Sequence, residues 1–316
     1  MAEFVVRRLI AAVPVLFLVT LIAASIMQLV PGDPASVIAG QSASNLEIEQ
    51  VRQQLGLDRP FYERVFNWYA GLLEGDLGRS ILLQRPVTQA ILERVPVTLT
   101  LAGFALFLTI AVGIPCGVIA ALRANTWVDQ AVLTFALVGV SVPNFWLSLM
   151  LIVLFGVMLD WLPAGGYVPL ADDPVGWARS LILPGVSLAL LQIGLLARMT
   201  RATMLETLRQ DYVRTARAKG LPARMVVGKH ALKNVMIPVV TVIGISFGLL
   251  LSGSVVIETV YSIPGMGRLL ANAIFGRDYP LIQGGLLVTA ATLVLLNLAV
   301  DLLYALIDPR VKYGRS

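Results

Sequence analysis

Apolar stretches long enough to cross a lipid bilayer recur along the chain, and shorter polar stretches separate them. A hydrocarbon core about 30 Å thick requires about 20 apolar residues in one helix, because each unpaired backbone group in lipid costs several kcal/mol. Six stretches meet this requirement, at approximately residues 9–30, 95–122, 130–159, 181–197, 236–257 and 281–306. The pattern therefore predicts an all-α integral membrane protein with six transmembrane helices.

Two of these stretches carry local signals of their own. Arg7 and Arg8 precede the first stretch, as in a secretory signal peptide, but its roughly 22 apolar residues exceed the roughly 7 to 15 of a signal-peptide core. We therefore interpret it as a retained membrane anchor. In the third stretch, Pro143 and Asn144 interrupt the apolar run and predict a kink or a break in the helix.

Residues 31–94 have the pattern of a small helical insertion after the first span. Ser44 and Glu47 have the spacing of a capping box, which predicts a first helix. Pro60 can open a second helix, which Gly75 ends. The apolar residues of this second helix recur at helical intervals at Phe61, Val65, Trp68, Tyr69, Leu72 and Leu73. We expect an extracytoplasmic cap that either braces the spans or receives a partner.

The chain accordingly divides into three parts. Residues 1–30 form the cytoplasmic N-terminus and the first span, and residues 31–94 form the insertion. Residues 95–316 form a core of five further helices, which includes a cytoplasmic loop at 198–235.

Composition supports a membrane protein and excludes several functional classes. Hydrophobic residues make up 57% of the chain and charged residues 14%, against roughly 25% charged in soluble domains. The net charge of +5 does not indicate nucleic-acid binding, because the basic residues are segregated between the apolar stretches. The single cysteine, Cys116, and the single histidine, His230, exclude an intrachain disulfide, a Cys- or His-based metal site and a Ser-His-Asp triad. No Gly-x-x-x-x-Gly-Lys-Ser/Thr phosphate loop occurs, so we expect no catalytic residues and no ATP hydrolysis by this chain.

The distribution of Lys and Arg predicts which loops face the cytoplasm. Residues 198–235 hold nine basic residues and two acidic ones. The two short loops expected on the other side, 160–180 and 258–280, hold only three basic residues between them, namely Arg179, Arg268 and Arg277. Because cytoplasmic loops collect basic residues, we expect 198–235 and both termini in the cytoplasm.

The basic stretch 198–235 has the pattern of a helical hairpin. Helix-forming residues continue beyond the fourth span to Lys219, Gly220 is a typical C-terminal stop, and Pro222 suits the first turn of a second, short helix. On that helix, basic residues flank an apolar stripe formed by Leu221, Met225, Gly228 and Leu232. Three roles remain open for this pattern: the charges orient the protein in the membrane, the helix lies on anionic lipid, or the stripe docks into a groove of a partner.

Short motifs along nearly the whole chain resemble those of one transporter family. "DYVRTARAKGL" (211–221) is similar to the cytoplasmic signature loop of ABC importer permeases in the form found in the peptide and nickel branch, although Arg214 and Lys233 replace a glutamate and a proline of the general signature. Further segments that look like this branch are "PGDPA" (31–35), "LGLDRPFYERVFNW" (55–68), "EGDLGRS" (74–80), "SVPNFW" (141–146), "ETVYSIPGMGRLL" (258–270) and "RDYPLIQG" (277–284). Together they resemble the B-type permease of a dipeptide or oligopeptide importer.

This resemblance implies a fold, a set of partners and a location. The fold is that of a type I ABC importer permease, in the inner membrane of a bacterium. The implied partners are a C-type permease subunit, two cytoplasmic ATP-binding subunits, an extracytoplasmic peptide-binding protein and membrane lipid, without nucleic acid. This chain would hold no cofactor, because ATP and Mg would bind to the partner ATPases.

The resemblance also implies that the hairpin couples this chain to the ATPases. The residues that we assign to this coupling are Arg214, Thr215, Ala216, Arg217, Ala218, Lys219, Gly220, Leu221, Arg224 and Met225.

The fifth span carries candidate residues for the translocation pathway. Gly244, Gly248 and Ser252 lie at i, i+4 and i+8 and form a ridge of small residues, and Thr241 and Ser246 add hydroxyl groups. The ridge either serves ordinary helix packing or lines the route of the cargo, whose backbone such hydroxyls can briefly satisfy.

Three charged residues near the ends of the last two spans have open roles. Glu258 and Arg268 flank a Pro-Gly turn, where they either pair or contact the binding protein. Asp301 is the only Asp, Glu, Lys, Arg or His residue in the six stretches, and we expect it to cap the last helix or to pair with a neighbour such as Arg310.

We therefore expect a permease subunit that couples ATP hydrolysis by its partners to alternating access for di- or oligopeptides. One alternative is the same architecture importing nickel chelates or glutathione. A second alternative is a membrane scaffold without a transport role.

Overall fold

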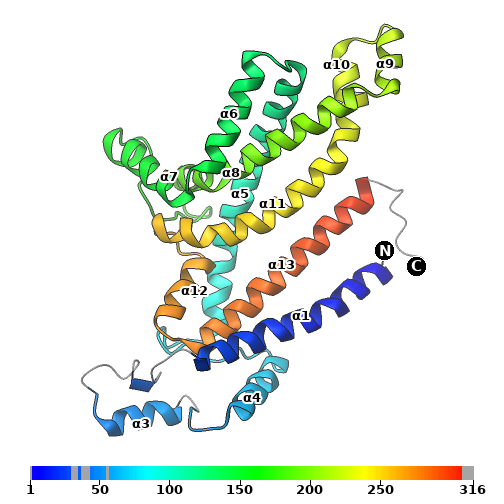
Figure 1. The fold of residues 1–316 in the computed structure, drawn as a ribbon. Helices are drawn as coiled ribbons and strands as arrows, with labels where there is room; N and C mark the ends of the chain where they lie inside the picture. The colour runs from blue at the N-terminus through cyan, green and yellow to red at the C-terminus, as the bar shows by residue number, and fades with distance from the viewer. Residues whose placement is uncertain (1, 30–34, 37–42, 55–56, 308–316) are drawn as a thin grey trace. The chain divides into compact units, whose positions relative to one another are not determined.

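The computed structural model describes residues 2–29, 35–36, 43–54 and 57–307, and regular structure in these ranges is helical apart from one isolated bridge between Arg79 and Pro86 (Figure 1). In chain order the elements are α1 (Ala2–Leu29), α3 (Asn45–Gln54), α4 (Phe61–Leu73), α5 (Val87–Leu122), α6 (Trp127–Ser141), α7 (Asn144–Leu151), the π-helix η1 (Ile152–Met158), α8 (Pro174–Leu208), α9 (Asp211–Ala218), α10 (Ala223–Met225), the π-helix η2 (Val226–Ala231), α11 (Leu232–Val260), α12 (Met266–Phe275) and α13 (Tyr279–Ile307). The chain forms two compact units. Unit 1 comprises Met1–Val97 and Gly265–Leu295, and unit 2 comprises Thr98–Pro264 and Leu296–Ser316.

Five helical segments in the described ranges are long and apolar enough to cross a membrane: Val5–Ser25, Val87–Leu122, Pro174–Leu208, Ala223–Val260 and Tyr279–Leu302. Two further segments, Trp127–Ser141 and Asn144–Met158, pass the same test together but are bent by 102°. The part of the chain that the structure describes therefore holds five candidate spans, or six if the bent pair counts as one, and the all-α membrane fold is confirmed.

The bend confirms the break that Pro143 and Asn144 predicted in the third apolar stretch. Val142 has an extended backbone with ψ 122°, and Pro143 stands at the N-cap of α7. A proline disfavours helical geometry in the residue before it, so α6 ends at this point.

The fourth span begins earlier than its apolar pattern predicted. The side chain of Asp173 accepts a hydrogen bond from the backbone nitrogen of Val175 at 3.0 Å, and Pro174 occupies the first turn of α8. An Asp-Pro pair is a helix-start signal in its own right, and it precedes the apolar stretch by about two turns.

The helices predicted for the insertion are present as α3 and α4. The backbone nitrogen of Ser44 donates to the Glu47 carboxylate at 2.7 Å, and the backbone nitrogen of Glu47 donates to Ser44 Oγ at 3.3 Å, which confirms the capping box. Pro60 caps α4, and Gly75 follows its end with a φ of +81°. The last of the recurring apolar residues, Leu73, ends α4, and its side chain is exposed.

The main core of unit 1 joins the start of α5 to α12 and the start of α13. Its buried residues are Leu77, Val87, Ala90, Ile91, Met266, Leu269, Ala273, Leu281 and Ile282. Beside this core, the buried carboxylate of Asp278 accepts hydrogen bonds from the Ser80 hydroxyl and from the backbone nitrogens of Leu82 and Leu281. Asp278 therefore caps α13 and fixes the segment before α5.

Helix α8 is the central element of unit 2, because small residues let its neighbours approach closely. A Cβ atom at Gly117 of α5 would lie 2.5 Å from the carbonyl oxygen of Ala197, and one at Gly194 would lie 2.7 Å from that of Ala136 in α6. Such small-residue contacts replace the hydrophobic driving force that helices lack in lipid.

Hydroxyl groups link the other end of unit 2. The buried Tyr261 hydroxyl lies 2.9 Å from Ser187 Oγ of α8 and donates to the carbonyl oxygen of Ser148 in α7 at 3.3 Å. The carbonyl oxygen of Tyr261 accepts the backbone N–H of Gly166 at 2.7 Å. Tyr261 thus ties together α7, α8 and the loop between them.

Candidate coupling hairpin and pathway helix

Residues 209–231 form a compact hairpin beyond the end of α8, although not as one continuous helix. Helix α8 ends at Leu208, and Gln210 has an extended backbone with ψ 148° before α9 begins at Asp211. The predicted continuous helix to Lys219 was therefore wrong. The break reorients α9 so that Val213 packs against Val226 of η2.

Gly220 closes the tip of the hairpin in a Schellman motif. Its backbone nitrogen donates to the carbonyl oxygen of Arg217 at 2.9 Å, and the backbone nitrogen of Leu221 donates to that of Ala216 at 3.3 Å. Gly220 has a φ of +76°, which L side chains rarely adopt. Pro222 then stands at the N-cap of α10, so the turn predicted from Gly220 and Pro222 is confirmed.

A small apolar core stabilises this hairpin. Val213, Ala216 and Val226 are buried in it, and Leu208 and Leu221 pack against it. The Asn234 amide donates to the Tyr212 hydroxyl at 2.7 Å and adds a polar link between α9 and α11.

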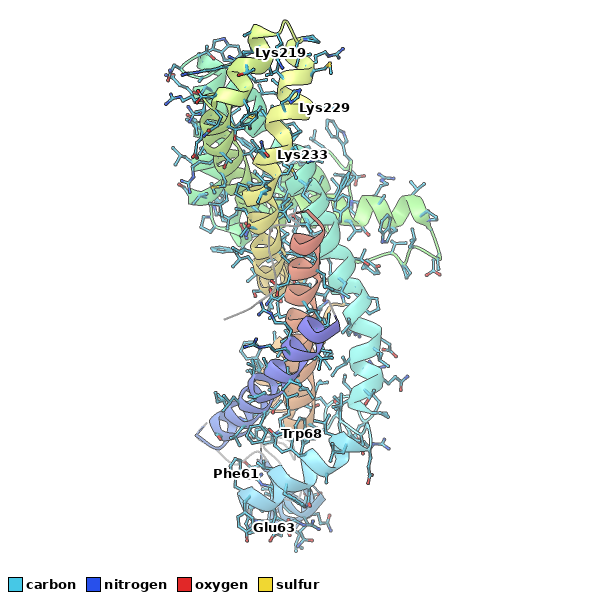
Figure 2. All side chains as sticks on the ribbon, turned by 90° about the vertical axis from the view of Figure 1, so that its right-hand side faces the viewer. Phe61, Glu63, Trp68, Lys219, Lys229 and Lys233 are labelled. Atoms are coloured by element: carbon cyan, nitrogen blue, oxygen red, sulfur yellow. The ribbon has the colours of Figure 1, made fainter. Side chains whose placement is uncertain are left out.

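Most residues assigned to coupling lie on the open surface of the hairpin. Ala216 is buried and Leu221 is half-buried. The exposed ones are Arg214, Thr215, Arg217, Ala218, Lys219, Gly220, Arg224 and Met225. Figure 2 shows Lys219 at the tip, with Lys229 and Lys233 following along the second arm. The hairpin therefore presents a basic rim that also carries the exposed apolar side chain of Met225.

The second arm is not a separate short helix, which corrects the prediction. It continues through the π-helix η2 into α11, and Ala223–Val260 forms one helical segment. Its buried positions Val226, Ala231 and Val235 are five and then four residues apart, because a π turn holds an extra residue. Met225 and Gly228 of the predicted stripe are exposed and remain accessible to a partner.

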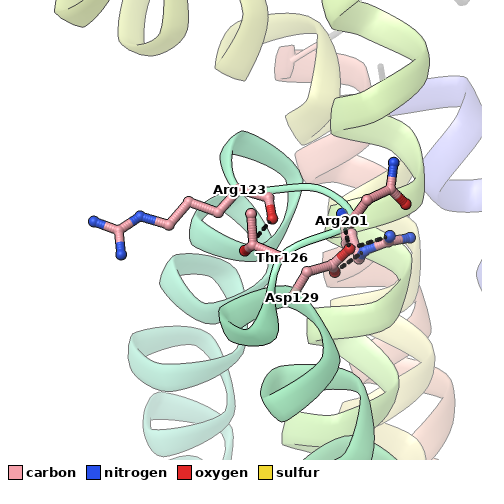
Figure 3. Close-up of polar contacts among 5 residues, drawn as sticks. Arg123, Thr126, Asp129 and Arg201 are labelled. Carbon is pink, nitrogen blue, oxygen red and sulfur yellow. Dashed lines mark hydrogen bonds and ion pairs between the residues drawn. The ribbon is translucent and has the colours of Figure 1, made fainter.

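An ion pair that the sequence pattern did not single out fastens α8 to α6 just before the hairpin (Figure 3). The Arg201 guanidinium binds the nearly buried Asp129 carboxylate through two nitrogens, with Nη2 2.6 Å from Oδ2. The Asp129 carboxylate also accepts a hydrogen bond from the backbone N–H of Asn125 at 2.9 Å, so it fixes the turn between α5 and α6. The sequence offered one signal for this pair. Asp129 lies in the short polar segment between the second and third apolar stretches, and Arg201 lies one helical turn beyond the fourth.

Two of the pathway candidates on α11 are packed inside unit 2. A Cβ atom at Gly244 would lie 2.4 Å from Val300 Cγ1 of α13, so this glycine serves helix packing. Ser246 is buried and donates to Gln192 Oε1 of α8 at 3.1 Å. The hydroxyl of Ser246 is therefore committed within the chain.

The other pathway candidates share an open face of α11. Thr241 and Ser252 are exposed, and a Cβ atom at Gly248 would meet nothing within 4 Å. The large side chains of Ile245 and Leu249 are exposed on the same side. This face, defined by Thr241, Ile245, Gly248, Leu249 and Ser252, combines apolar surface with two hydroxyl groups and has no charge.

The three charged residues near the ends of the last two spans differ in how deeply they are buried. Glu258 is fully buried and accepts a hydrogen bond from Thr98 Oγ1 at 2.6 Å, so we withdraw it as a surface contact for a binding protein. Arg268 is half-buried in α12. Asp301 is half-buried in α13, and its suggested partner Arg310 lies outside the described residues.

Within the described ranges, no group of His, Cys, Asp and Glu side chains has the arrangement of a metal site. The hairpin and the open face of α11 are thus the features to which a function can be assigned.

Comparison with known proteins identifies relatives along the full chain. The model of the family "binding-protein-dependent transport system inner membrane component" matches residues 113–313, and the model of the N-terminal part of such components matches residues 1–102. A putative peptide transport system permease protein of Brucella abortus is 50% identical, and the match covers 99% of this chain and 100% of the relative. A glutathione transport system permease protein of Escherichia coli is 43% identical, with the same coverage of both chains.

A solved structure shares the fold. A chain from an inward-facing structure of the MetNI methionine ABC transporter superposes with a TM-score of 0.58 and 19% identity. The match covers 70% of this chain and 97% of the other chain.

Proposed function

Since the chain belongs to the family of inner membrane components of binding-protein-dependent transport systems, it is a permease subunit of an ABC importer, and we propose that its cargo is a short peptide. The near-complete match to a relative named as a peptide permease supports this cargo class. The chain is a multi-pass protein of the bacterial inner membrane. Membership in this family does not favour the scaffold alternative.

The observation that carries the proposed coupling role is the exposed basic rim on a rigid hairpin. Arg217, Lys219 and Arg224 are exposed, while the Val213 core and the Gly220 turn hold the backbone that carries them. A surface element that transmits force needs a backbone held by packing and side chains that face outward. The hairpin has both, because its apolar core holds the backbone and its basic side chains are exposed. The positive charge near the tip would complement an acidic surface on a partner ATPase.

The arrangement of helices suggests how movement at the hairpin reaches the pathway. The first arm, α9, follows α8 after the break at Gln210, and the Arg201–Asp129 pair fastens α8 to α6. The second arm continues directly into α11. Closure of two ATP-bound partner subunits would push the hairpin, and α8, α6 and α11 would move with it. The open face of α11, with Thr241, Gly248 and Ser252, then lines the route that turns from one side of the membrane to the other.

The orientation and the partners belong to the same proposal. Both termini and the hairpin face the cytoplasm, because the basic residues gather there. A C-type permease completes the pathway, two ATP-binding subunits hold ATP and Mg, and an extracytoplasmic binding protein delivers the cargo. Arg268 remains a candidate contact for that binding protein.

Glutathione is a second candidate cargo, because one relative is named as a glutathione permease. Glutathione is itself a tripeptide, so the same backbone-directed contacts would serve. Uptake of labelled dipeptides, longer peptides and glutathione by cells with the complete importer separates these cargoes.

The coupling role is tested with Gly220→Pro combined with Arg224→Glu in the complete importer. Proline cannot adopt a φ of +76°, so the turn is lost together with a rim charge. We expect peptide uptake and peptide-stimulated ATP hydrolysis to fall while the complex still assembles. Arg59→Glu, an exposed charge change in unit 1, is the matched control. Full uptake by the double variant would overturn the coupling role.

A further inference from the structure

Helix α4 is an amphipathic helix whose apolar arc is only partly covered by the protein. At about 100° per residue, Phe61, Val65, Trp68 and Leu72 share one face, and all four side chains are half-buried in unit 1. Leu72 packs against the main core of that unit. The polar residues Glu63 and Asn67 are exposed on another face. In Figure 2, Trp68 lies on the side of α4 nearer to α1, and Glu63 lies on the opposite side.

A second apolar face of α4 lies next to the packed face. Tyr62, Phe66, Tyr69 and Leu73 fall within an arc of about 60° at that angular step. Tyr62 is 70% exposed, Phe66 73% and Leu73 91%. A water-facing helix would place polar residues at these positions, so their exposure requires an apolar neighbour.

Tyr69 shows where this second face lies, because it packs against the first span. Its ring stacks on Phe17 of α1 with 5.2 Å between the ring centroids. Its hydroxyl donates to the carbonyl oxygen of Phe17 at 3.1 Å and lies 2.6 Å from Thr20 Oγ1. Thus α4 touches α1 at Tyr69, and the same face stays open on both sides of the contact, at Tyr62 and Phe66 and at Leu73.

The contact lies within the membrane rather than above it. The apolar span of α1 runs from Val5 to Ser25. At 1.5 Å per residue, Thr20 is about 8 Å and Phe17 about 12 Å below the end of that span, and half of the hydrocarbon core is about 15 Å. Tyr69 therefore sits at the depth of one leaflet. A binding protein in water cannot cover Phe66 or Leu73 at that depth.

We propose that α4 lies in the membrane interface, with Tyr62, Phe66 and Leu73 inserted among the lipids of the leaflet at the C-terminal end of α1. Phe17, Leu18 and Ile22 of the span are also exposed, and Tyr69 of α4 stacks on Phe17. Aromatic side chains favour the boundary between headgroups and acyl chains. The insertion is thus a lateral anchor that fixes the depth and tilt of α1 in the bilayer.

Spin labels test this proposal in the complete importer in lipid nanodiscs. In a Cys116→Ser background, Tyr62→Cys, Phe66→Cys and Leu73→Cys report on the apolar face, and Glu63→Cys and Asn67→Cys are matched controls on the same helix. Oxygen concentrates in lipid, whereas a water-soluble nickel chelate stays outside it. We expect a ratio of oxygen to nickel accessibility severalfold higher at the three apolar positions than at the two controls, with and without binding protein.

Two results would overturn the proposal. Nickel accessibility at Phe66→Cys equal to that at Glu63→Cys, lost only when the binding protein is added, would assign the face to the binding protein. Immobilised labels that exclude both reagents would assign it to another subunit. Leu73→Cys repeats the measurement on the other side of Tyr69 if a label at position 66 prevents assembly.

Discussion

Arg201 on α8 binds Asp129 at the start of α6 through two guanidinium nitrogens, and Asp129 also holds the turn before α6 through the Asn125 backbone N–H. The pair lies about two turns before the end of α8 at Leu208, where the hairpin begins. In the proposed coupling, a push on the hairpin would therefore be shared between α8 and α6, rather than absorbed by bending of α8 alone.

Arg201→Ala should destabilise the protein and weaken coupling. Removing one partner leaves the nearly buried Asp129 carboxylate without its counter-charge, which costs about 3 kcal/mol. Thermal unfolding of the detergent-solubilised complex and the ratio of peptide uptake to ATP hydrolysis measure the two effects. Arg201→Lys keeps the charge but loses the two-nitrogen geometry and should be intermediate. Unchanged stability of the Arg201→Ala variant would contradict the conclusion that the Arg201–Asp129 ion pair fastens α8 to α6.

Gly220→Ala should lower the stability of the hairpin by about 1 kcal/mol, because alanine at a φ of +76° is strained. No steric clash contributes, since a Cβ atom at Gly220 would meet nothing within 4 Å. Gly228→Ala is the matched control, because a Cβ atom there is also free and the residue lies in a helix without positive φ. Hydrogen exchange of residues 211–231 compares the two variants, and equal protection in both would show that the Gly220 turn is not under conformational constraint.

Gly117→Ala should separate α5 from α8. The new methyl group would lie 2.5 Å from the Ala197 carbonyl oxygen and 2.6 Å from Thr200 Cβ, and overpacking of this kind costs about 1 to 3 kcal/mol. Gly103→Ala on the same helix meets nothing within 4 Å and should be neutral. The unfolding midpoints of the two variants provide the measurement, and a neutral Gly117→Ala would refute the close approach.

The start of α3 should lose protection in acid. The hydrogen bond from the Ser44 backbone nitrogen lowers the pKa of Glu47 below its usual value. A carboxyl whose pKa is lowered on folding stabilises the helix above its unfolded pKa, about 4.3, and this contribution is lost as the pH falls through the lower folded pKa. The protection of the α3 amides, expressed relative to their intrinsic exchange rate at each pH, should therefore be constant from neutral pH down to about pH 5 and should fall below it. In Glu47→Gln this acid-dependent step should disappear, and its persistence would assign the effect to another group.

Local signals allowed much of the fold to be predicted from the sequence. Ser44 and Glu47, Pro143, and Gly220 act within a few residues of their own position, so their capping box, break and turn follow from the residue types alone. The apolar stretches also predicted the spans, because the thickness of the bilayer fixes the length of helix that crosses it. The extent of α8 was missed because its Asp173 cap lies outside the apolar part of the helix.

Features that depend on tertiary contacts were not predictable in this way. The pairing of Arg201 with Asp129 joins residues far apart in the sequence, and the burial of Glu258 depends on Thr98 of another helix. Two of the proposed pathway residues, Gly244 and Ser246, are packed inside unit 2, whereas Thr241, Gly248 and Ser252 lie on an open face. The spacing of small residues along the sequence does not distinguish these two groups.

The wide turn at η2 gives the second arm a register that a plain helix would not have. If the same residues from Val226 to Ala231 were wound as an ordinary α-helix, every side chain upstream would rotate by about 100° relative to α11. Arg224 and Met225 would then point in new directions although neither had been changed. The extra residue of this wide turn therefore sets the direction in which the exposed side chains of the hairpin point.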